Sequence, residues 1–209
     1  MSRPFDIVVV ASRRRKALIL AHLDAVDHVV SWTPDYPMPN GYSTPIQHSG
    51  LAENIGQYRC FRGHQDALSK STAPVSLVLE DDAAPNRPEW LSFTERASAL
   101  LDEYEVVSLH SRDTKGRPFQ RKDIRGIEVL VPSGKWRAPH AKIDLVWALG
   151  SLAYLIRQDA RESLLKMEWD GLPIDLLIAN RFKFCTLADT PFNHDRSEGS
   201  LLEPGIGNG

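Results

Sequence analysis

The first half of the chain alternates short apolar runs with longer segments in which apolar residues recur every three or four positions. The runs are rich in β-branched residues and have no polar face, which is typical of strands buried on both sides of a parallel sheet. In the helical segments the apolar positions form one stripe, as in Ala17, Leu18, Leu20, Ala21 and Leu23. The pattern predicts strands over Phe5–Ala11, His28–Trp32, Val75–Leu79 and Glu105–Leu109, and helices over Arg13–Val26, Leu51–Ser69 and Pro88–Asp102.

The second half is less regular. Residues 110–142 are polar and rich in turn-forming residues, with one strand candidate at Ile127–Val131. An apolar segment at Val146–Ile156 follows, then predicted helices over Asp159–Met167 and Ile174–Arg181 and a last strand over Lys183–Leu187. Because strands and helices alternate along most of the chain, we predict an α/β fold, a single Rossmann-like domain with a mostly parallel central sheet.

Length and composition narrow the class of protein without identifying it. The 209 residues suffice for one sizeable domain, and 42% hydrophobic and 25% charged residues are ordinary for a globular protein. The formal net charge of −2 gives no global argument for nucleic acid or an anionic membrane as partner. The N-terminus reads as a strand and not a signal peptide, no apolar run approaches ~20 residues, and two cysteines are too few for a disulfide framework. We therefore expect a cytoplasmic protein with no transmembrane segment.

Three adjacent carboxylates, Glu80, Asp81 and Asp82, follow directly after the predicted strand Val75–Leu79. In open α/β sheets, ligands bind outside the carboxyl ends of the strands, so these side chains lie where a binding site is expected. Adjacent negative charges repel one another and are tolerated when solvent screens them or a cation neutralises them. Mg²⁺ and Mn²⁺ prefer carboxylate oxygens and are often bound together with phosphate. For the triplet alone two interpretations remain open, a metal–diphosphate site and a solvated loop.

Three segments, in this order, resemble glycosyltransferase family 25, which contains lipopolysaccharide-type and collagen galactosyltransferases. The first, RCFRGHQDALSKSTAPVSLVLEDDAAP (59–85), places Gly63-His64 on a helix ahead of an apolar strand that ends in Glu-Asp-Asp. The second, ALGSLAYLIRQDARESLL (148–165), is similar to the family's Gly-x-x-x-Tyr-Leu-Ile segment and the helix after it. The third, GLPIDLLI (171–178), is similar to its Pro-Val-Asp element. The first strand departs from the family, because Val10-Ala11-Ser12 stands in place of the usual Asn-Leu pair.

The resemblance implies a GT-A-like fold and a metal-dependent transferase that moves a hexose from a nucleotide-sugar, with a UDP-sugar expected, to a hydroxyl of a glycan or lipopolysaccharide. It implies that Asp82, with Glu80 or Asp81, holds Mn²⁺ or Mg²⁺ against the donor's diphosphate. Neighbouring side chains of a strand point to opposite faces, so we expect Asp82 to bind the ion and Asp81 to face the ribose or a water. His194 is the candidate for a histidine that completes the metal shell in several GT-A enzymes, with a surface loop as the alternative.

Four further residues are candidates for the donor site. Ser12 ends the first strand and Arg13 opens the segment after it, where a helix N-terminus with cations near it would bind phosphate or uracil. Arg59 and His64 lie on the helix before the acidic strand, and the resemblance implies that the end of this helix lines the donor site. The alternatives are a solvated basic turn for Arg13 and a hydrogen-bonded structural histidine for His64.

Asp175 is the candidate general base, since the resemblance implies that it lies on the acceptor side. An apolar setting raises the pKa of a carboxyl group and suits it to take the proton of an acceptor hydroxyl in an inverting transfer. Asp is also a preferred N-cap residue, and LPIDLLIAN begins an apolar helix, so a cap is the alternative.

Residues 110–142 hold nine Lys/Arg against three Asp/Glu, with Phe119 and Trp136 among them. This positive charge favours a phosphate-bearing acceptor, nucleic acid with a modified base included, or is simply a solvated loop face. We assign residues 1–109 to a nucleotide-sugar-binding half, 110–200 to an acceptor-side half and 201–209 to a flexible tail. A nucleic-acid-binding protein and a non-catalytic, nucleotide-sugar-binding relic of the same fold remain alternative functions.

Overall fold

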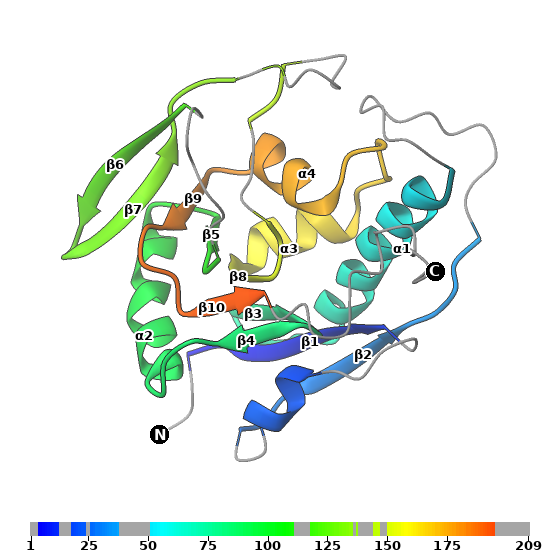
Figure 1. Cartoon of the computed structure of the whole chain (residues 1–209), viewed down its shortest axis with the longest axis horizontal. Helices are drawn as coiled ribbons and strands as arrows, with labels where there is room; N and C mark the ends of the chain where they lie inside the picture. The colour runs from blue at the N-terminus through cyan, green and yellow to red at the C-terminus, as the bar shows by residue number, and fades with distance from the viewer. Residues whose placement is uncertain are drawn as a thin grey trace, which may run out of the picture.

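The computed structural model describes residues 4–12, 18–23, 26–37, 51–110, 118–135, 137, 144–146 and 150–194, with the backbone alone for 51–54. Its centre is an eight-stranded sheet in the order β2-β1-β3-β8-β5-β9-β7-β6 (Figure 1). The strands are β1 (Asp6–Ser12), β2 (Val29–Thr33), β3 (Val75–Glu80), β5 (Val106–Ser108), β6 (Phe119–Ile124), β7 (Ile127–Pro132), β8 (Ala153–Arg157) and β9 (Phe184–Leu187). A second, two-stranded sheet joins β4 (Ala83–Pro85) and β10 (Phe192–His194).

Six of the eight strands of the main sheet run in the same direction. β1 is parallel to β2 and β3, and β5 is parallel to β9, whereas β8 runs antiparallel to both of its neighbours and β7 antiparallel to β9 and β6. The predicted α/β fold with a mostly parallel central sheet is therefore confirmed. Because β8 lies between β3 and β5, the first and second halves of the chain interleave in one sheet.

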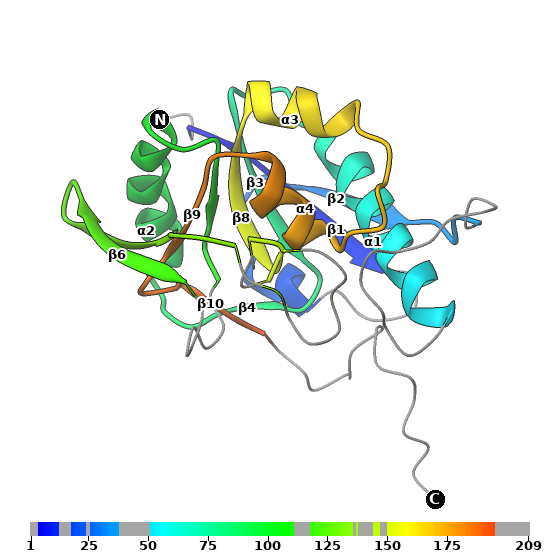
Figure 2. The ribbon, with the colours of Figure 1, turned by 90° about the horizontal axis from the view of Figure 1, so that it is seen from above.

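Helices cover both faces of the sheet (Figure 2). On one face lie α1 (Leu51–Leu68), α3 (Gln158–Leu165) and α4 (Ile174–Arg181), and on the other η1 (Leu18–His22), α2 (Trp90–Ala97) and η2 (Ser98–Asp102). Alternate residues of β1 serve the two sides, since Val8 and Val10 pack with the first set of helices and Ile7 and Val9 with the second. Burial on both faces explains why the inner strands read as continuous apolar runs.

Two helix predictions need correction. The helix expected over Arg13–Val26 is wrong in the described part, where a 3₁₀-helix spans only Leu18–His22 and Val26 lies in a bend. The Val26 N–H donates to the Leu23 carbonyl, so the chain turns towards β2 instead of continuing a helix. The helix expected from Pro88 begins two residues later, at Trp90, and its last turn tightens into η2.

Four strands escaped prediction, namely β4, β6, β10 and β8, the last of which overlaps the segment Val146–Ile156 that the sequence shows only as an apolar run. β6 is polar and mostly exposed, and it is held by a hairpin with β7 that turns at Arg125 and Gly126, whose φ angles are 55° and 76°. β4 and β10 have three residues each, too few to show an alternating pattern. Within the described part of the chain, no helix is long and apolar enough to cross a membrane.

Candidate functional site

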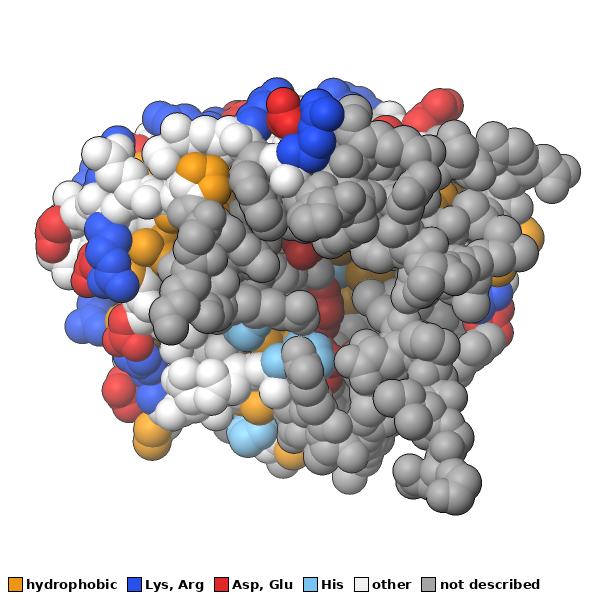
Figure 3. Space-filling model, turned by 45° about the horizontal axis from the view of Figure 1, so that its top comes forward, with side chains coloured by type: hydrophobic (Ala, Val, Ile, Leu, Met, Phe, Trp, Pro, Cys, Tyr) orange, Lys and Arg blue, Asp and Glu red, His pale blue; other side chains and the backbone are white. Residues whose placement is uncertain are grey.

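The three carboxylates lie at the carboxyl end of β3, in the middle of the main sheet. β3 ends at Glu80, and Asp81 and Asp82 form the turn that leads into β4. Asp81 and Asp82 are only 3% and 2% exposed, so the solvated-loop interpretation is wrong. Figure 3 shows acidic and histidine side chains side by side in the middle of this face. A buried carboxylate is costly unless it is paired or bound to a cation, and here each carboxylate has a different partner.

Asp81 is held at the end of β1. Because β1 and β3 are parallel neighbours, their carboxyl ends meet at the same edge of the sheet. The backbone N–H of Ser12 donates to Asp81 Oδ2 at 2.8 Å, and the N–H of Ile19 donates to the Asp81 carbonyl at 3.3 Å. The structure thus brings together the predicted residues Ser12 and Asp81, while Arg13 lies outside the described residues.

Asp82 faces His194. β4 and β10 pair antiparallel with His194 opposite Ala83, the residue that follows Asp82. His194 Nε2 lies 3.0 Å from Asp82 Oδ2, and both side chains are largely buried. The pairing of two very short strands therefore places the predicted metal ligand His194 beside the predicted metal ligand Asp82, although the two are far apart in the sequence.

Glu80 faces the opposite way, towards α1 and β8. Ser151 Oγ donates to Glu80 Oε1, and His64 Nε2 lies 3.3 Å from the same oxygen. Burial alone would raise the pKa of Glu80, but the hydrogen bond and charge of His64, the Ser151 hydroxyl and the charge of His194 outweigh burial and lower the pKa to about 2. Glu80 is consequently ionised at neutral pH.

His64 is fully buried, and Tyr154 on β8 holds its ring. The Tyr154 hydroxyl lies 2.8 Å from His64 Nδ1, and the two rings stack with centroids 5.7 Å apart and planes inclined by 15°. Burial, followed by the charge of Glu80, raises the pKa of Tyr154 well above its usual value, so the phenol keeps its proton. The part of α1 that carries His64 therefore reaches Glu80, and the contact with Tyr154 agrees with the alternative of a hydrogen-bonded structural histidine.

Cys60 lies one helical turn before His64 on α1 and faces Glu80 as well. Its Sγ, His64 Nε2 and a Glu80 carboxylate oxygen all lie within 4.8 Å of one another. Burial raises the pKa of the Cys60 thiol well above its usual value, and the charges of Glu80, Asp175, Asp81 and Asp82 add to this effect. The metal-free thiol is therefore protonated and is a poor nucleophile.

Asp175 is the second residue of α4, close enough to the cluster for its charge to act on Cys60. Pro173 is the N-cap residue of α4, so the interpretation of Asp175 as an N-cap is wrong. Its Oδ1 accepts the backbone N–H of Leu176 at 2.9 Å, and the side chain is partly exposed. Asp175 is therefore partly open to solvent while its charge still acts on Cys60.

Arg59 lies apart from the carboxylates. Its Nε donates to the Tyr36 carbonyl at 3.1 Å, and its guanidinium lies 3.2 Å from Asp35 Oδ1. These contacts fasten α1 to the segment after β2. Of the donor-site residues predicted on α1, the structure places His64 in the carboxylate cluster and Arg59 outside it.

The donor atoms around Asp82 fit the ion that the resemblance implies. Carboxylate oxygens suit Mg²⁺ and Mn²⁺, and an imidazole nitrogen beside them favours Mn²⁺ over Mg²⁺. Asp82 and His194 offer one of each at 3.0 Å, whereas the buried carboxylate of Asp81 accepts the Ser12 N–H. His194 belongs to a pairing strand, so its interpretation as part of a surface loop does not hold for the described residues.

Sequence reasoning missed Cys60, Ser151 and Tyr154. A signal for Cys60 was present, because Cys60 and His64 are four apart on a predicted helix and therefore share one face. Tyr154 lies within the apolar segment Val146–Ile156, where an aromatic residue reads as core. Ser151 had no signal, since its position follows from the antiparallel pairing of β8 with β3.

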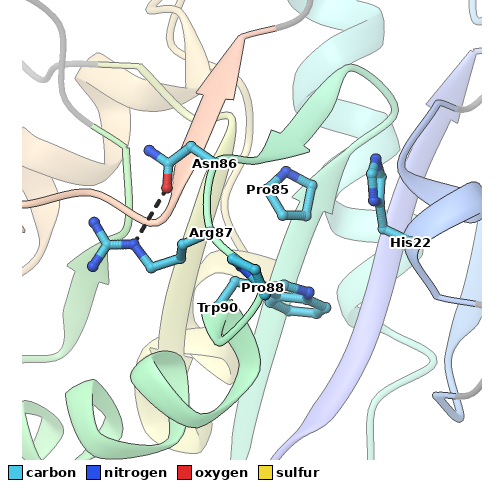
Figure 4. A pocket seen from close by; sticks show the side chains of 6 residues that line it. All are labelled: His22, Pro85, Asn86, Arg87, Pro88 and Trp90. Carbon is cyan, nitrogen blue, oxygen red and sulfur yellow. Dashed lines mark hydrogen bonds between the residues drawn. The ribbon is translucent and has the colours of Figure 1, made fainter.

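A separate open pocket of about 410 Å³ lies between η1 and the start of α2 (Figure 4). It is lined by His22, Pro85, Asn86, Arg87, Pro88 and Trp90. Arg87 binds both carboxylate oxygens of Asp189, at 3.1 and 2.5 Å, so its charge is already neutralised. The pocket shares no residue with the carboxylate cluster.

Residues 110–142, the basic segment, form ion pairs that neutralise part of their positive charge where the structure describes them. Exposed ion pairs join Arg121 to Glu128, Arg125 to Asp102 at 2.7 Å and Arg137 to Asp144 at 2.8 Å. Four of its basic residues, Arg112, Lys115, Arg117 and Lys142, fall outside the described residues, as does Trp136. The described part therefore offers less free positive charge than the sequence suggests.

No family model matches the chain, and the search of curated proteins gives no match either. Among solved structures, A197 from STIV is similar at 11% identity and a TM-score of 0.43, over 91% of this chain and 86% of that one. HddC from Yersinia pseudotuberculosis follows at 11% identity and 0.41, over 90% and 72%. Mannose-1-phosphate geranyltransferase from Thermus thermophilus has 16% identity and 0.39, over 90% and 60%. Similarity at this level carries no argument about what this chain binds or does.

Proposed function

We propose that the protein is a metal-dependent glycosyltransferase that moves a hexose from a nucleotide-sugar, a UDP-sugar in the first instance, to an acceptor hydroxyl. The observation that supports this most is the placement of Glu80, Asp81 and Asp82. Glu80 ends β3, and the buried Asp81 and Asp82 form the turn after it, at the edge of the sheet where ligands of α/β sheets bind. Because a buried carboxylate is costly unless it is paired or bound to a cation, this placement supports a cation site.

The divalent ion is assigned to Asp82 and His194. Their donor atoms are 3.0 Å apart, and because Asp82 lies in the turn before β4 whereas His194 ends β10, a bound ion would also join this turn to β10. When bound, the ion supplies positive charge to the donor diphosphate and to the nucleoside diphosphate that leaves. Glu80 was also expected to bind this ion, but its contacts with His64 and Ser151 favour a different role, argued below.

The nucleotide is assigned to the edge of the sheet where β1 and β3 end. Asp81 accepts the N–H of Ser12 and so fixes the end of β1 against the end of β3. This contact leaves Asp81 in place to orient the donor next to the ion, and Ser12 to line the pocket. In this arrangement Asp81 positions the donor and Asp82 binds the ion.

Asp175 is assigned as the general base. In the transfer, the acceptor oxygen bonds to the anomeric carbon, its proton passes to the Asp175 carboxylate, and the bond from that carbon to the diphosphate breaks. Inversion follows from a single displacement of this kind, as the resemblance implies. Asp175→Asn should keep donor binding and lose most of the transfer rate, by roughly 10²-fold or more. Turnover close to that of the wild type would exclude this role.

The acceptor is assigned only as a hydroxyl compound, with a phosphate-bearing glycan or lipid first. The ion pairs of Arg121, Arg125 and Arg137 reduce the positive charge available to a polyanion, so nothing described favours nucleic acid over a glycan. Acceptor binding that weakens steeply with salt would favour a polyanion, whereas a flat response would favour a neutral glycan.

A thermal-shift panel of nucleotide-sugars, with and without Mn²⁺, tests the proposal. A ligand at a hundredfold excess over its dissociation constant stabilises the folded state by about 2.7 kcal/mol, or roughly 5–10 °C for a chain of this size. We expect a shift for UDP-sugars that requires Mn²⁺ and is absent in Asp82→Asn, with Glu168→Gln, an exposed acid on the surface, behaving as the wild type. No shift with any nucleotide-sugar would contradict the proposal.

A further inference from the structure

Glu80 belongs to a second group of possible metal ligands, which it forms with two side chains of α1. Cys60 and His64 share one face of α1, four residues apart, and Glu80 is the last residue of β3. Cys60 Sγ, His64 Nε2 and a Glu80 oxygen are all within 4.8 Å of one another. A thiol, an imidazole and a carboxylate at this spacing form a different donor set from the carboxylates and histidine around Asp82.

The state of His64 argues that this group is more than an ion pair. Its side chain is fully buried, and its Nε2 faces Glu80 Oε1 from 3.3 Å as an ion pair whose geometry is too poor for a strong hydrogen bond. Its Nδ1 is occupied by the Tyr154 hydroxyl, which fixes the ring and leaves Nε2 directed into the cluster. Buried polar nitrogens are nearly always satisfied, so a nitrogen held in this way calls for an additional partner.

We propose that Cys60, His64 and Glu80 bind a zinc ion, or another borderline-soft divalent metal. Tetrahedral zinc, with Zn–N and Zn–O of about 2.0–2.2 Å and Zn–S of about 2.3 Å, holds neighbouring ligand atoms roughly 3.3–3.6 Å apart. The His64–Glu80 distance of 3.3 Å already matches, and Cys60 Sγ lies within 4.8 Å of both ligand atoms. The Tyr154 hydroxyl on Nδ1 is the kind of outer contact that orients a metal-binding histidine.

This site is distinct in position and in metal preference from the one around Asp82. Thiolate and imidazole ligands select zinc over Mg²⁺ and Mn²⁺. Three protein ligands leave a fourth position for water, and Glu80 is 20% exposed, which gives the ion a route of entry. The zinc would fasten α1 to the end of β3, and its charge would offset the repulsion among three adjacent carboxylates.

Cobalt substitution tests the zinc site without any nucleotide. We expect chelator-treated protein to bind one equivalent of Zn²⁺, and Co²⁺ in its place to give the near-ultraviolet thiolate-to-cobalt charge-transfer band. Cys60→Ser, nearly isosteric, should remove the band and weaken Zn²⁺ binding at least tenfold, and Glu80→Gln should weaken it at least tenfold. Cys185→Ser removes the other cysteine, buried in β9 outside the cluster, and should retain both the band and the affinity.

The zinc site is tested independently of the proposed sugar transfer. Zn²⁺ affinity unchanged in Cys60→Ser, or no thiolate band in the wild type, would overturn it. Circular dichroism of Cys60→Ser establishes that a loss of binding is not a loss of fold. His194→Gln should keep the thiolate band; loss of the band in that variant would show one shared site and would also overturn the inference. Failure of nucleotide-sugar binding, by contrast, would leave the zinc result untouched.

Discussion

At the scale of single residues, three consecutive acids have three separate environments. Asp81 accepts a backbone N–H from β1, Asp82 faces His194 and Glu80 faces His64 and Ser151. The alternation of side chains along an extended chain predicts that neighbours diverge, and it therefore predicted different roles for Asp81 and Asp82. It could not predict the partners, because all of them come from other parts of the chain.

Replacing His194 tests the donor-side ion at this scale. His194→Gln keeps a polar side chain but removes the imidazole nitrogen that lies 3.0 Å from Asp82. We expect the Mn²⁺ concentration for half-maximal binding to rise at least tenfold, as measured by Mn²⁺ electron paramagnetic resonance. His28→Gln, whose Nδ1 contacts only the nearby Val26 carbonyl among the bonds described, is the control and should bind Mn²⁺ as the wild type. Equal affinity in both variants would remove His194 from the metal site.

Asp6 gives a prediction about pH and stability that is independent of the site. Its Oδ2 accepts the N–H groups of Thr72 and Ala73, at 2.7 and 2.8 Å, and the Ser71 hydroxyl at 3.0 Å. Burial alone would raise the pKa of Asp6, but these hydrogen bonds and the charge of Arg161 outweigh it and lower the pKa. A lowered folded pKa means that Asp6 stabilises the fold fully above its unfolded value of about 3.9, and that this contribution is lost as pH falls through the folded value.

Asp6→Asn should therefore lower the free energy of unfolding at pH 7 by about 1.5–3 kcal/mol, since a hydrogen-bonded charge is removed. The difference from the wild type should shrink below about pH 4. Denaturant unfolding at a series of pH values measures both effects. Asp102→Asn, which loses only an exposed ion pair with Arg125, should change stability by about 0–1 kcal/mol. A difference for Asp6→Asn that stays constant down to pH 3 would contradict the assignment.

At the scale of elements, α1 reaches the site because Gly63 lets it lie close to the ends of β1 and β2. A Cβ at Gly63 would lie 2.4 Å from Thr33 Oγ1 and 3.2 Å from Val10 Cγ1. The next residue, His64, then meets Glu80. The adjacent Gly63 and His64, on which the family resemblance partly rests, thus have a local explanation: one residue permits the approach and the other uses it.

Gly63→Ala should destabilise the protein by about 1–3 kcal/mol, because the new methyl group overlaps Thr33. An exposed helical glycine would give the opposite sign, since alanine is the better helix former by about 1 kcal/mol. Thermal or denaturant unfolding measures the change. The double variant Gly63→Ala with Thr33→Ala removes the overlapping atoms and should recover most of the loss. If Thr33→Ala gives no recovery, the close approach is not the cause.

The elements that the sequence predicted are those with a strong local pattern. β1, β3 and α1 were predicted within a few residues, because the strands are buried on both faces and the helix is long. The elements that complete the site, β4 and β10, have three residues each and gain their pairing only from distant parts of the chain. The position of His194 therefore depends on tertiary structure and is not encoded in its neighbours.

At the scale of the whole molecule, the side chains around Glu80, Asp81 and Asp82 come from distant parts of the chain. α1 supplies Cys60 and His64, β8 supplies Tyr154, and β10 supplies His194. β8 and β10 follow the basic segment, so the division into a nucleotide half and an acceptor half does not correspond to separate units of the sheet. Asp175, from α4 on the α1 side of the sheet, is close enough for its charge to act on Cys60.

The central claim is that Asp82 holds an ion on which sugar transfer depends. Release of UDP from a panel of UDP-sugars, with Mn²⁺ or with chelator, in wild type, Asp82→Asn and Glu168→Gln, measures it most directly. We predict Mn²⁺-dependent release in the wild type and in Glu168→Gln, and a loss of roughly 10²-fold or more in Asp82→Asn. Release that is equal in Asp82→Asn, or that proceeds undiminished in chelator, would contradict the claim.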